Sequence, residues 1–186
     1  MNVILIGFRC SGKSSVGQEL ARRLKHEFVD SDEYIESRTH LSIREIFDIA
    51  GESYFRLLEA DALADLTKLD GKVIATGGGA VLRYKNIRAM KRNGLLFFMD
   101  VDAPHAYERI RQDPKTKTRR PRLTDRDPYN EIQEQIEFRK PYYLGAADLV
   151  VQTAGREVEE VVQEIVQHLK ERGFPVPEDD ADAQIA

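Results

Sequence analysis

A short glycine-rich segment near the N-terminus carries one lysine and one serine at a spacing that suits phosphate chemistry. Residues Gly7 to Ser14 read G-x-x-x-x-G-K-S, and they directly follow the apolar run Val3 to Ile6. In a loop of this kind the backbone N–H groups point at phosphate oxygens, and the following helix directs its positive end at the same anion. Lys13 would reach the outer phosphates, and the Ser14 hydroxyl would bind Mg²⁺. We therefore predict a nucleoside triphosphate site here, in preference to a Gly/Ser-rich turn that binds nothing.

Two aspartates stand two residues apart at the end of the next predicted strand. Asp30 closes that strand and Asp32 follows it, at the edge where ligands gather in open α/β sheets. Because alternate residues of an extended chain point to the same side, both carboxylates can serve one site. Asp30 is placed to hold magnesium or its waters, and Asp32 to accept the proton of an acceptor hydroxyl. The alternative for Asp32 is the cap of a helix that begins near Glu33.

An arginine and a glutamate lie three residues apart on a predicted helix, and a run of glycines ends the strand that follows. Taken alone, Arg56 and Glu59 would form an ordinary surface ion pair. The segment Val73 to Val81 reads V-I-A-T-G-G-G-A-V, so its strand exposes backbone N–H groups to any ligand at the strand tip. Three consecutive glycines are entropically costly, and we interpret them as a mark of close backbone approach.

The stretch from Gln112 to Pro128 is polar, lacks apolar periodicity and is rich in positive charge. Its basic residues are Lys115, Lys117, Arg119, Arg120, Arg122 and Arg126. In a small kinase such a stretch would be a mobile lid that excludes water and brings positive charge to the transferring phosphoryl group. The alternatives are a solvated loop and a nucleic-acid-binding loop. The second is disfavoured, since no aromatic residues are interleaved and the chain is acidic overall.

The elements that must position these residues alternate between strand-like and helical patterns along the whole chain. This alternation predicts an α/β fold with a parallel sheet flanked by helices. Predicted strands cover residues 3–6, 28–30, 73–76, 95–101 and 148–151. Predicted helices cover residues 16–25, 43–47, 54–66, 86–92, 104–111, 131–144 and 158–169.

The length and composition of the chain limit the number of domains, the classes of binding partner and the cellular compartment. With 186 residues, of which 41% are hydrophobic, the chain suits a single domain over residues 1–172, followed by a disordered acidic tail over residues 173–186. The net charge of −4 gives no general attraction for nucleic acid or a membrane surface. The N-terminus lacks the basic region and long apolar run of a signal peptide, and the lone Cys10 suits a reducing compartment, so we expect a cytoplasmic protein. The four histidines show no metal-ligand spacing.

Taken in order, these motifs resemble the shikimate kinase family. The matching segments are the phosphate loop, the D-S-D, the segment Ser42 to Glu59, the segment Val73 to Val81, and Arg120-Pro121. The resemblance implies a three-layer P-loop kinase fold, like that of the nucleoside monophosphate kinases, with a five-stranded parallel sheet and a mobile lid. It also implies transfer of the ATP γ-phosphate to the 3-hydroxyl of shikimate, with Mg²⁺ as cofactor, on the route to chorismate and the aromatic amino acids.

The resemblance further implies roles for individual residues. ATP would be bound by Cys10, Ser11, Gly12, Lys13, Ser14, Ser15, Arg120 and Arg156. Arg111 is a second candidate for the adenine contact. Shikimate would be bound by Asp32, Arg56, Gly78 and Arg139, beside Gly77, Gly79 and Glu59, in a pocket walled by Phe47 and Phe55. The catalytic residues would be Lys13, Asp32 and Arg120, and the metal ligands Ser14 and Asp30.

The chemistry of the acceptor agrees with these roles. An arginine can donate two parallel hydrogen bonds to a carboxylate, and an aspartate can accept a hydrogen bond from an alcohol. Without the resemblance, Arg139 would be interpreted as solvated helix surface. Two segments depart from the family pattern: the lid reads R-P-R-L and is long before Arg120, and Y-L-G-A-A replaces the usual Y-x-E-V-A. The rival functions are a kinase of another hydroxy-acid such as gluconate and a non-catalytic sensor of nucleotide or shikimate. We expect a monomer.

Overall fold

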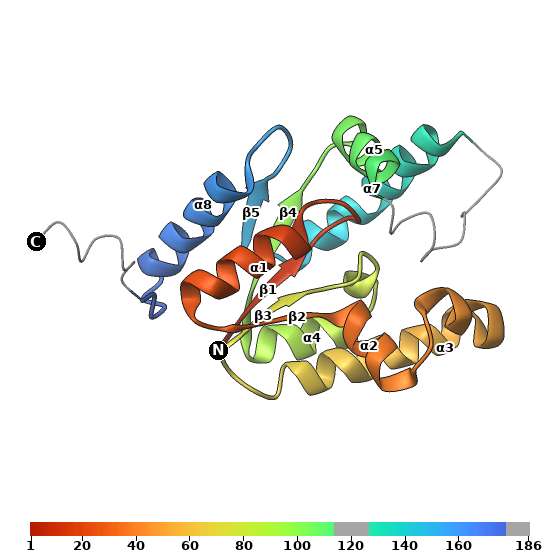
Figure 1. The fold of residues 1–186 in the computed structure, drawn as a ribbon, viewed down its shortest axis with the longest axis horizontal. Coiled ribbons are helices and arrows are strands. Elements are labelled where there is room, and N and C mark those ends of the chain that lie inside the picture. The colour runs from red at the N-terminus through yellow and green to blue at the C-terminus, as the bar shows by residue number, and fades with distance from the viewer. Residues whose placement is uncertain (114–126, 178–186) are drawn as a thin grey trace, which may run out of the picture.

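The computed structural model describes residues 1–113 and 127–177, and within them five parallel strands form one sheet in the order β2-β3-β1-β4-β5 (Figure 1). The strands are β1 (Asn2–Ile6), β2 (Glu27–Asp30), β3 (Lys72–Ala75), β4 (Gly94–Asp100) and β5 (Leu149–Gln152). The helices are α1 (Lys13–Leu24), α2 (Ser31–Thr39), α3 (Ile43–Leu66), the short 3₁₀ helix η1 (Ala80–Leu82), α4 (Tyr84–Arg92), α5 (Ala103–Gln112), α7 (Pro128–Ala146) and α8 (Val158–Glu171). The predicted fold class is confirmed.

Strand β1 lies at the centre of the sheet, between β3 and β4, and all of its residues are buried. Val3 and Leu5 face one layer of helices, whereas Ile4 and Ile6 face the other. An unbroken apolar run is what a strand covered on both faces requires. The loop after β1 therefore opens at the carboxyl edge of the sheet, where the neighbouring strands β3 and β4 also end.

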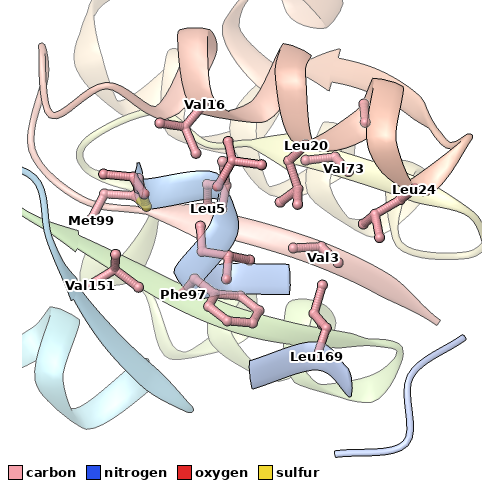
Figure 2. Close-up of a cluster of buried hydrophobic side chains, with 14 of the residues drawn as sticks. Val3, Leu5, Val16, Leu20, Leu24, Val73, Phe97, Met99, Val151 and Leu169 are labelled. Carbon is pink, nitrogen blue, oxygen red and sulfur yellow. The ribbon is translucent and has the colours of Figure 1, made fainter. Parts of the chain in front are cut away.

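Helices cover both faces of the sheet. On one face α1 and α8 pack together, with Leu20 and Leu169 among the buried side chains between them and the strands (Figure 2). On the other face lie α3, α4 and α7, whose buried side chains include Leu63, Met90 and Tyr143. The sheet is thus the middle of three layers, and the ligand-binding edge is left to the loops.

Helix α3 is interrupted at Gly51, whose backbone is not helical (φ 75, ψ 174). Its start is fixed by a capping box, in which Ser42 and Glu45 exchange side-chain and backbone hydrogen bonds. The helices predicted at 43–47 and 54–66 are therefore two halves of one kinked element. The kink brings the rings of Phe47 and Phe55 to a centroid distance of 5.0 Å.

The two aspartates after β2 do not lie on an extended chain, so the geometric reason given from the sequence is wrong. Asp30 ends β2 and caps α2, where its carboxylate accepts hydrogen bonds from the N–H groups of Asp32 (2.9 Å) and Glu33 (3.5 Å). Asp32 lies in the first turn of that helix. The alternative of Asp32 as the cap is wrong too, because Asp30 holds the capping position.

The predicted tail begins too early. Disorder was expected from residue 173 onward, but Phe174 is only 7% exposed and packs into the core between α1 and α8, with Val176 beside it. Residues 178–186 lie outside the described residues, as does most of the predicted lid, residues 114–126. None of the helices in the described ranges combines the length and apolar composition of a membrane span.

Candidate active site

The loop between β1 and α1 is shaped to receive an anion. Gly12 caps α1 in the left-handed conformation (φ 90, ψ 4) that other residues rarely adopt. Lys13 begins the helix and is 8% exposed, and its ammonium group donates hydrogen bonds to the carbonyls of Gly7 (2.9 Å) and Phe8 (2.6 Å). The positive end of α1 and this buried ammonium group therefore converge on one loop.

This loop forms a wall of a cavity of about 610 Å³, a volume that suits a nucleotide-sized ligand. Of the residues predicted to bind ATP, the cavity is lined by Cys10, Ser11, Gly12, Lys13, Ser14, Ser15 and Arg156. Arg120, the remaining member of that set, lies outside the described residues. The structure thus brings together every member of that set that it describes.

The two predicted metal ligands also lie together. The Ser14 hydroxyl donates a hydrogen bond to Asp30 Oδ2 at 3.1 Å, while Oδ1 of the same carboxylate caps α2. Across the described residues no group of three His, Cys, Asp or Glu side chains could hold a metal by itself. A hydroxyl and a carboxylate beside a phosphate loop fit Mg²⁺, which commonly takes one or two protein oxygens and fills its remaining positions with phosphates and water.

A second, smaller cavity of about 110 Å³ adjoins this site and carries charge of both signs. Its polar side chains are Arg9, Asp32, Arg56, Glu59, Gln135 and Arg139, and its apolar wall is formed by Ile43, Phe47 and Phe55. All four predicted substrate residues line it, since Gly78 contributes backbone. Asp32 and Gly78 line the larger cavity as well, so the two cavities meet at these residues.

Two of the glycines after β3 have side chains of the site pressed against them. A Cβ atom on Gly77 would lie 2.7 Å from Asp32 Oδ1, and one on Gly79 would lie 2.5 Å from Arg56 Nη1. The sequence predicted close approach to a ligand at this turn. The structure shows close approach by Asp32 and Arg56, which the glycines allow to reach the cavity.

Arg56 stands between two carboxylates of α3. Its Nη1 donates to both oxygens of Glu59 (3.0 and 3.1 Å), and its Nε and Nη2 donate to Glu52 (3.2 and 2.9 Å). Burial works against the charged form of Arg56, but the two carboxylates outweigh it and raise the pKa of its guanidinium. Burial also raises the pKa of Glu59, against the opposing charge of Arg56. Since the Glu59 side chain is 0% exposed, this is no ordinary surface ion pair.

Helix α7 brings Arg139 into the smaller cavity rather than leaving it on solvated surface. Arg139 Nη1 lies 3.5 Å from the carbonyl oxygen of Gly78, and one helical turn later the Tyr143 hydroxyl donates to the same oxygen at 2.5 Å. The Tyr143 ring is 2% exposed and stacks on Phe98 of the sheet at a centroid distance of 4.8 Å. Tyr143 therefore fixes the distance between α7 and the glycine turn, a role that the sequence did not reveal.

The two arginines considered for the adenine contact both have partners within the protein. Arg156 lines the cavity but donates to Glu164 and to the backbone of α8, and Arg111 lies over the Tyr107 ring. Arg109 instead connects the two loops there, donating to the carbonyls of Cys10 (3.3 Å) and Thr153 (2.8 Å). The available signal was helical phase, because Arg109 lies one turn after the buried Ala106.

Arg9 is a second residue that the sequence analysis missed. It occupies a variable position of the phosphate loop, yet it lines both cavities and its guanidinium lies 5.7 Å from the centre of the Phe8 ring. A cation within the loop, beside Lys13, was the signal that could have identified it.

Comparison with known proteins agrees with this arrangement. A family model described as shikimate kinase matches residues 9–170. A shikimate kinase of Hahella chejuensis is 40% identical over 169 residues, covering 91% of this chain and 86% of that protein. One of Symbiobacterium thermophilum is 39% identical over 173 residues, covering 93% and 98%. The solved structure of the Acinetobacter baumannii shikimate kinase in complex with shikimate gives a TM-score of 0.86 at 30% identity, covering 94% of this chain and 95% of that one.

The likeness extends over nearly the whole chain and includes the loops that form both cavities. The range matched by the family model, residues 9–170, spans Lys13, Asp32, Arg56 and Arg139. The chain therefore belongs to the shikimate kinase family.

Proposed function

We propose that the protein transfers the γ-phosphate of ATP to the 3-hydroxyl of shikimate, forming shikimate 3-phosphate and ADP. The observation that carries this proposal is that Asp32 lines both the phosphate-loop cavity and the arginine-lined cavity. An acceptor alcohol held in the smaller cavity would meet the terminal phosphate at this carboxylate. The product would feed the synthesis of chorismate and the aromatic amino acids.

Each residue then has a chemical role. Asp32 accepts the hydrogen bond of the acceptor hydroxyl and takes up its proton as the oxygen attacks phosphorus. Lys13 and the N–H groups at the start of α1 stabilise the charge on the transferring phosphoryl oxygens. Ser14 and Asp30 would hold Mg²⁺, which neutralises phosphate charge and orients the nucleotide when bound. Arg120, which lies outside the described residues, stays a sequence-based candidate for a further cation at the phosphates.

The acceptor would be recognised mainly by charge. Arginine presents two parallel N–H groups to a carboxylate, which lysine cannot do. Arg56 from α3 and Arg139 from α7 line the cavity from different elements, and Arg9 adds a third cation from the phosphate loop. Phe47 and Phe55 offer an apolar wall to the carbon ring of the substrate. We further propose that the enzyme acts as a cytoplasmic monomer, folded as one domain.

The test is a coupled assay of ADP release with purified protein, ATP and Mg²⁺, offering shikimate, quinate and gluconate in turn. We expect saturable ADP release with shikimate and little with gluconate. Preferred phosphorylation of gluconate would support the rival kinase, and binding of shikimate without ADP release would support the sensor. Either result would overturn the proposal.

A further inference from the structure

The two carboxylates that hold Arg56 differ sharply in exposure. The Glu59 side chain is 0% exposed and binds Nη1 alone, whereas the Glu52 side chain is 64% exposed and binds Nε and Nη2. Nε and Nη2 form the edge of a guanidinium that grips a carboxylate through two parallel hydrogen bonds. The edge of Arg56 that suits an acceptor carboxylate is thus occupied by a glutamate of the protein itself.

The kink in α3 explains how Glu52 reaches this place. Gly51 adopts φ 75, where an L-residue is strained, and a Cβ atom there would meet nothing within 4 Å. The glycine therefore serves the backbone turn and not a tight contact. Directly after it, Glu52 lies one turn before Arg56, so the two side chains share a face of the helix.

We infer that Glu52 is an exchangeable counter-ion of Arg56, which the carboxylate of the acceptor displaces when it binds. This inference rests on the proposed function of the smaller cavity. Displacement costs little on the side of Glu52, because an exposed carboxylate returns to water, whereas Glu59 is buried and stays in place.

The consequence is a selectivity for charge. In the structure both Nε and Nη2 donate to one oxygen of Glu52, Oε1, whereas an acceptor carboxylate can offer one oxygen to each of them. A neutral analogue leaves Glu52 in position and gains nothing from Arg56. Glu52 competes with the acid for Arg56 and therefore weakens the binding of the acid slightly. While no acid is bound, Glu52 keeps the Arg56 guanidinium paired.

The opposite role would be a fixed support, in which Glu52 orients Arg56 toward the substrate and stays bound throughout. The two roles predict opposite changes in the KM for the acid when Glu52 is removed. An exchangeable counter-ion competes with the acid, so its removal lowers the KM for the acid. A fixed support cooperates with the acid, so its removal raises that KM.

The experiment compares Glu52→Gln and Glu52→Ala with wild type in the coupled assay, using shikimate and its neutral methyl ester. Asp48→Asn is the matched control, because Asp48 is equally exposed at 64% and pairs with Arg44 on the same helix, away from both cavities. We expect the KM for shikimate to fall about two- to fivefold in both Glu52 variants, as exposed ion pairs allow. The KM for the ester, the KM for ATP and kcat should stay at wild-type values.

A KM for shikimate that is unchanged or raised in both variants would overturn the inference, as would an equal fall for the ester. Circular dichroism and the melting temperature verify that the variants are folded. A wild-type enzyme inactive on shikimate would contradict the proposed function itself. An active wild-type enzyme whose Glu52 variants gain no affinity would contradict this inference alone.

Discussion

The ammonium group of Lys13 is buried in the phosphate loop, where it donates hydrogen bonds to the backbone carbonyls of Gly7 and Phe8. A cation held in this way by carbonyl dipoles is poised to exchange them for phosphate oxygens, which carry full negative charge. The same principle of a prepared charge applies to Arg56, which is held by carboxylates instead. At the scale of single residues, the cationic groups of the site are thus already in position before the ligands bind.

Replacing Lys13 by alanine should abolish catalysis while the fold remains. Loss of a cation that stabilises the transferring phosphoryl group typically costs a factor of about 10³ or more in kcat. The measurement is kcat in the coupled assay together with the melting temperature. Lys85→Ala, an exposed lysine of α4, is the control and should retain full activity. An active Lys13→Ala enzyme would contradict the assignment.

Replacing Arg56 or Arg139 by lysine should raise the KM for shikimate about 10- to 100-fold, because a hydrogen bond to a charged group is worth about 1.5–3 kcal/mol. The KM for ATP should change little, since neither arginine lines the larger cavity. Both constants come from the same assay with one substrate varied at a time. An equal rise in the KM for shikimate and the KM for ATP would show that these arginines do not specifically bind the acceptor carboxylate.

The buried Glu59 makes stability depend on pH in a defined direction. Because burial raises its pKa above the ordinary value of 4.5, the folded state binds this proton more tightly than the unfolded chain. The stability that Glu59 contributes is therefore full below about pH 4.5 and is lost as the pH rises through the raised pKa. Urea unfolding of wild type and Glu59→Gln across pH 4 to 8 should show wild type losing stability relative to the variant as pH rises. The opposite slope would mean that Arg56 dominates and lowers this pKa.

At the scale of elements, α3, with its kink at Gly51, and α7 line the smaller cavity from two sides. The sheet provides the fixed reference, since β3 ends in the glycine turn and Tyr143 of α7 stacks on Phe98 of β4. The relative position of Arg56 and Arg139 thus depends on how each helix is attached to the glycine turn.

Removing the Tyr143 hydroxyl should loosen this attachment. Tyr143→Phe leaves the buried Gly78 carbonyl without its 2.5 Å hydrogen bond and should cost about 1 kcal/mol of stability. The KM for shikimate should rise about three- to tenfold while the KM for ATP stays constant, because Arg139 lies on the same helix one turn away. Tyr142→Phe, at an exposed neighbouring position, is the control. A KM for shikimate that does not move would limit Tyr143 to a role in stability.

The sequence was most informative about the helices and strands and least informative about the orientation of individual side chains. The order and spacing of the apolar runs and motifs were sufficient to predict the parallel sheet, the phosphate loop and the location of both aspartates. They failed for the geometry after β2, because the pattern does not show where a strand turns into a helix, and Asp30 caps α2 instead of continuing the strand. The sequence pattern also did not single out Arg109, because its two hydrogen bonds go to loops that are distant from it in the sequence.

At the scale of the whole molecule, the carboxyl edge of the sheet joins two cavities of different character. The larger is bounded by the loop after β1, α1 and the loop after β5, and the smaller by α3, α7 and the glycine turn after β3. The sheet order places β1 next to β3, so the phosphate loop and the glycine turn lie side by side (Figure 1). Phosphoryl transfer from one cavity to the other across Asp32 is the central claim of this account.

The most direct test measures ADP and phosphorylated acceptor together in a single reaction. Purified protein is incubated with ATP, Mg²⁺ and shikimate, and both products are quantified by ³¹P nuclear magnetic resonance, with wild type compared with Asp32→Asn. We expect ADP and a shikimate 3-phosphate signal to appear in equal amounts for wild type, only when shikimate is present, and to be lost in the variant. ADP formation that does not depend on shikimate, or full product formation by Asp32→Asn, would contradict transfer across Asp32.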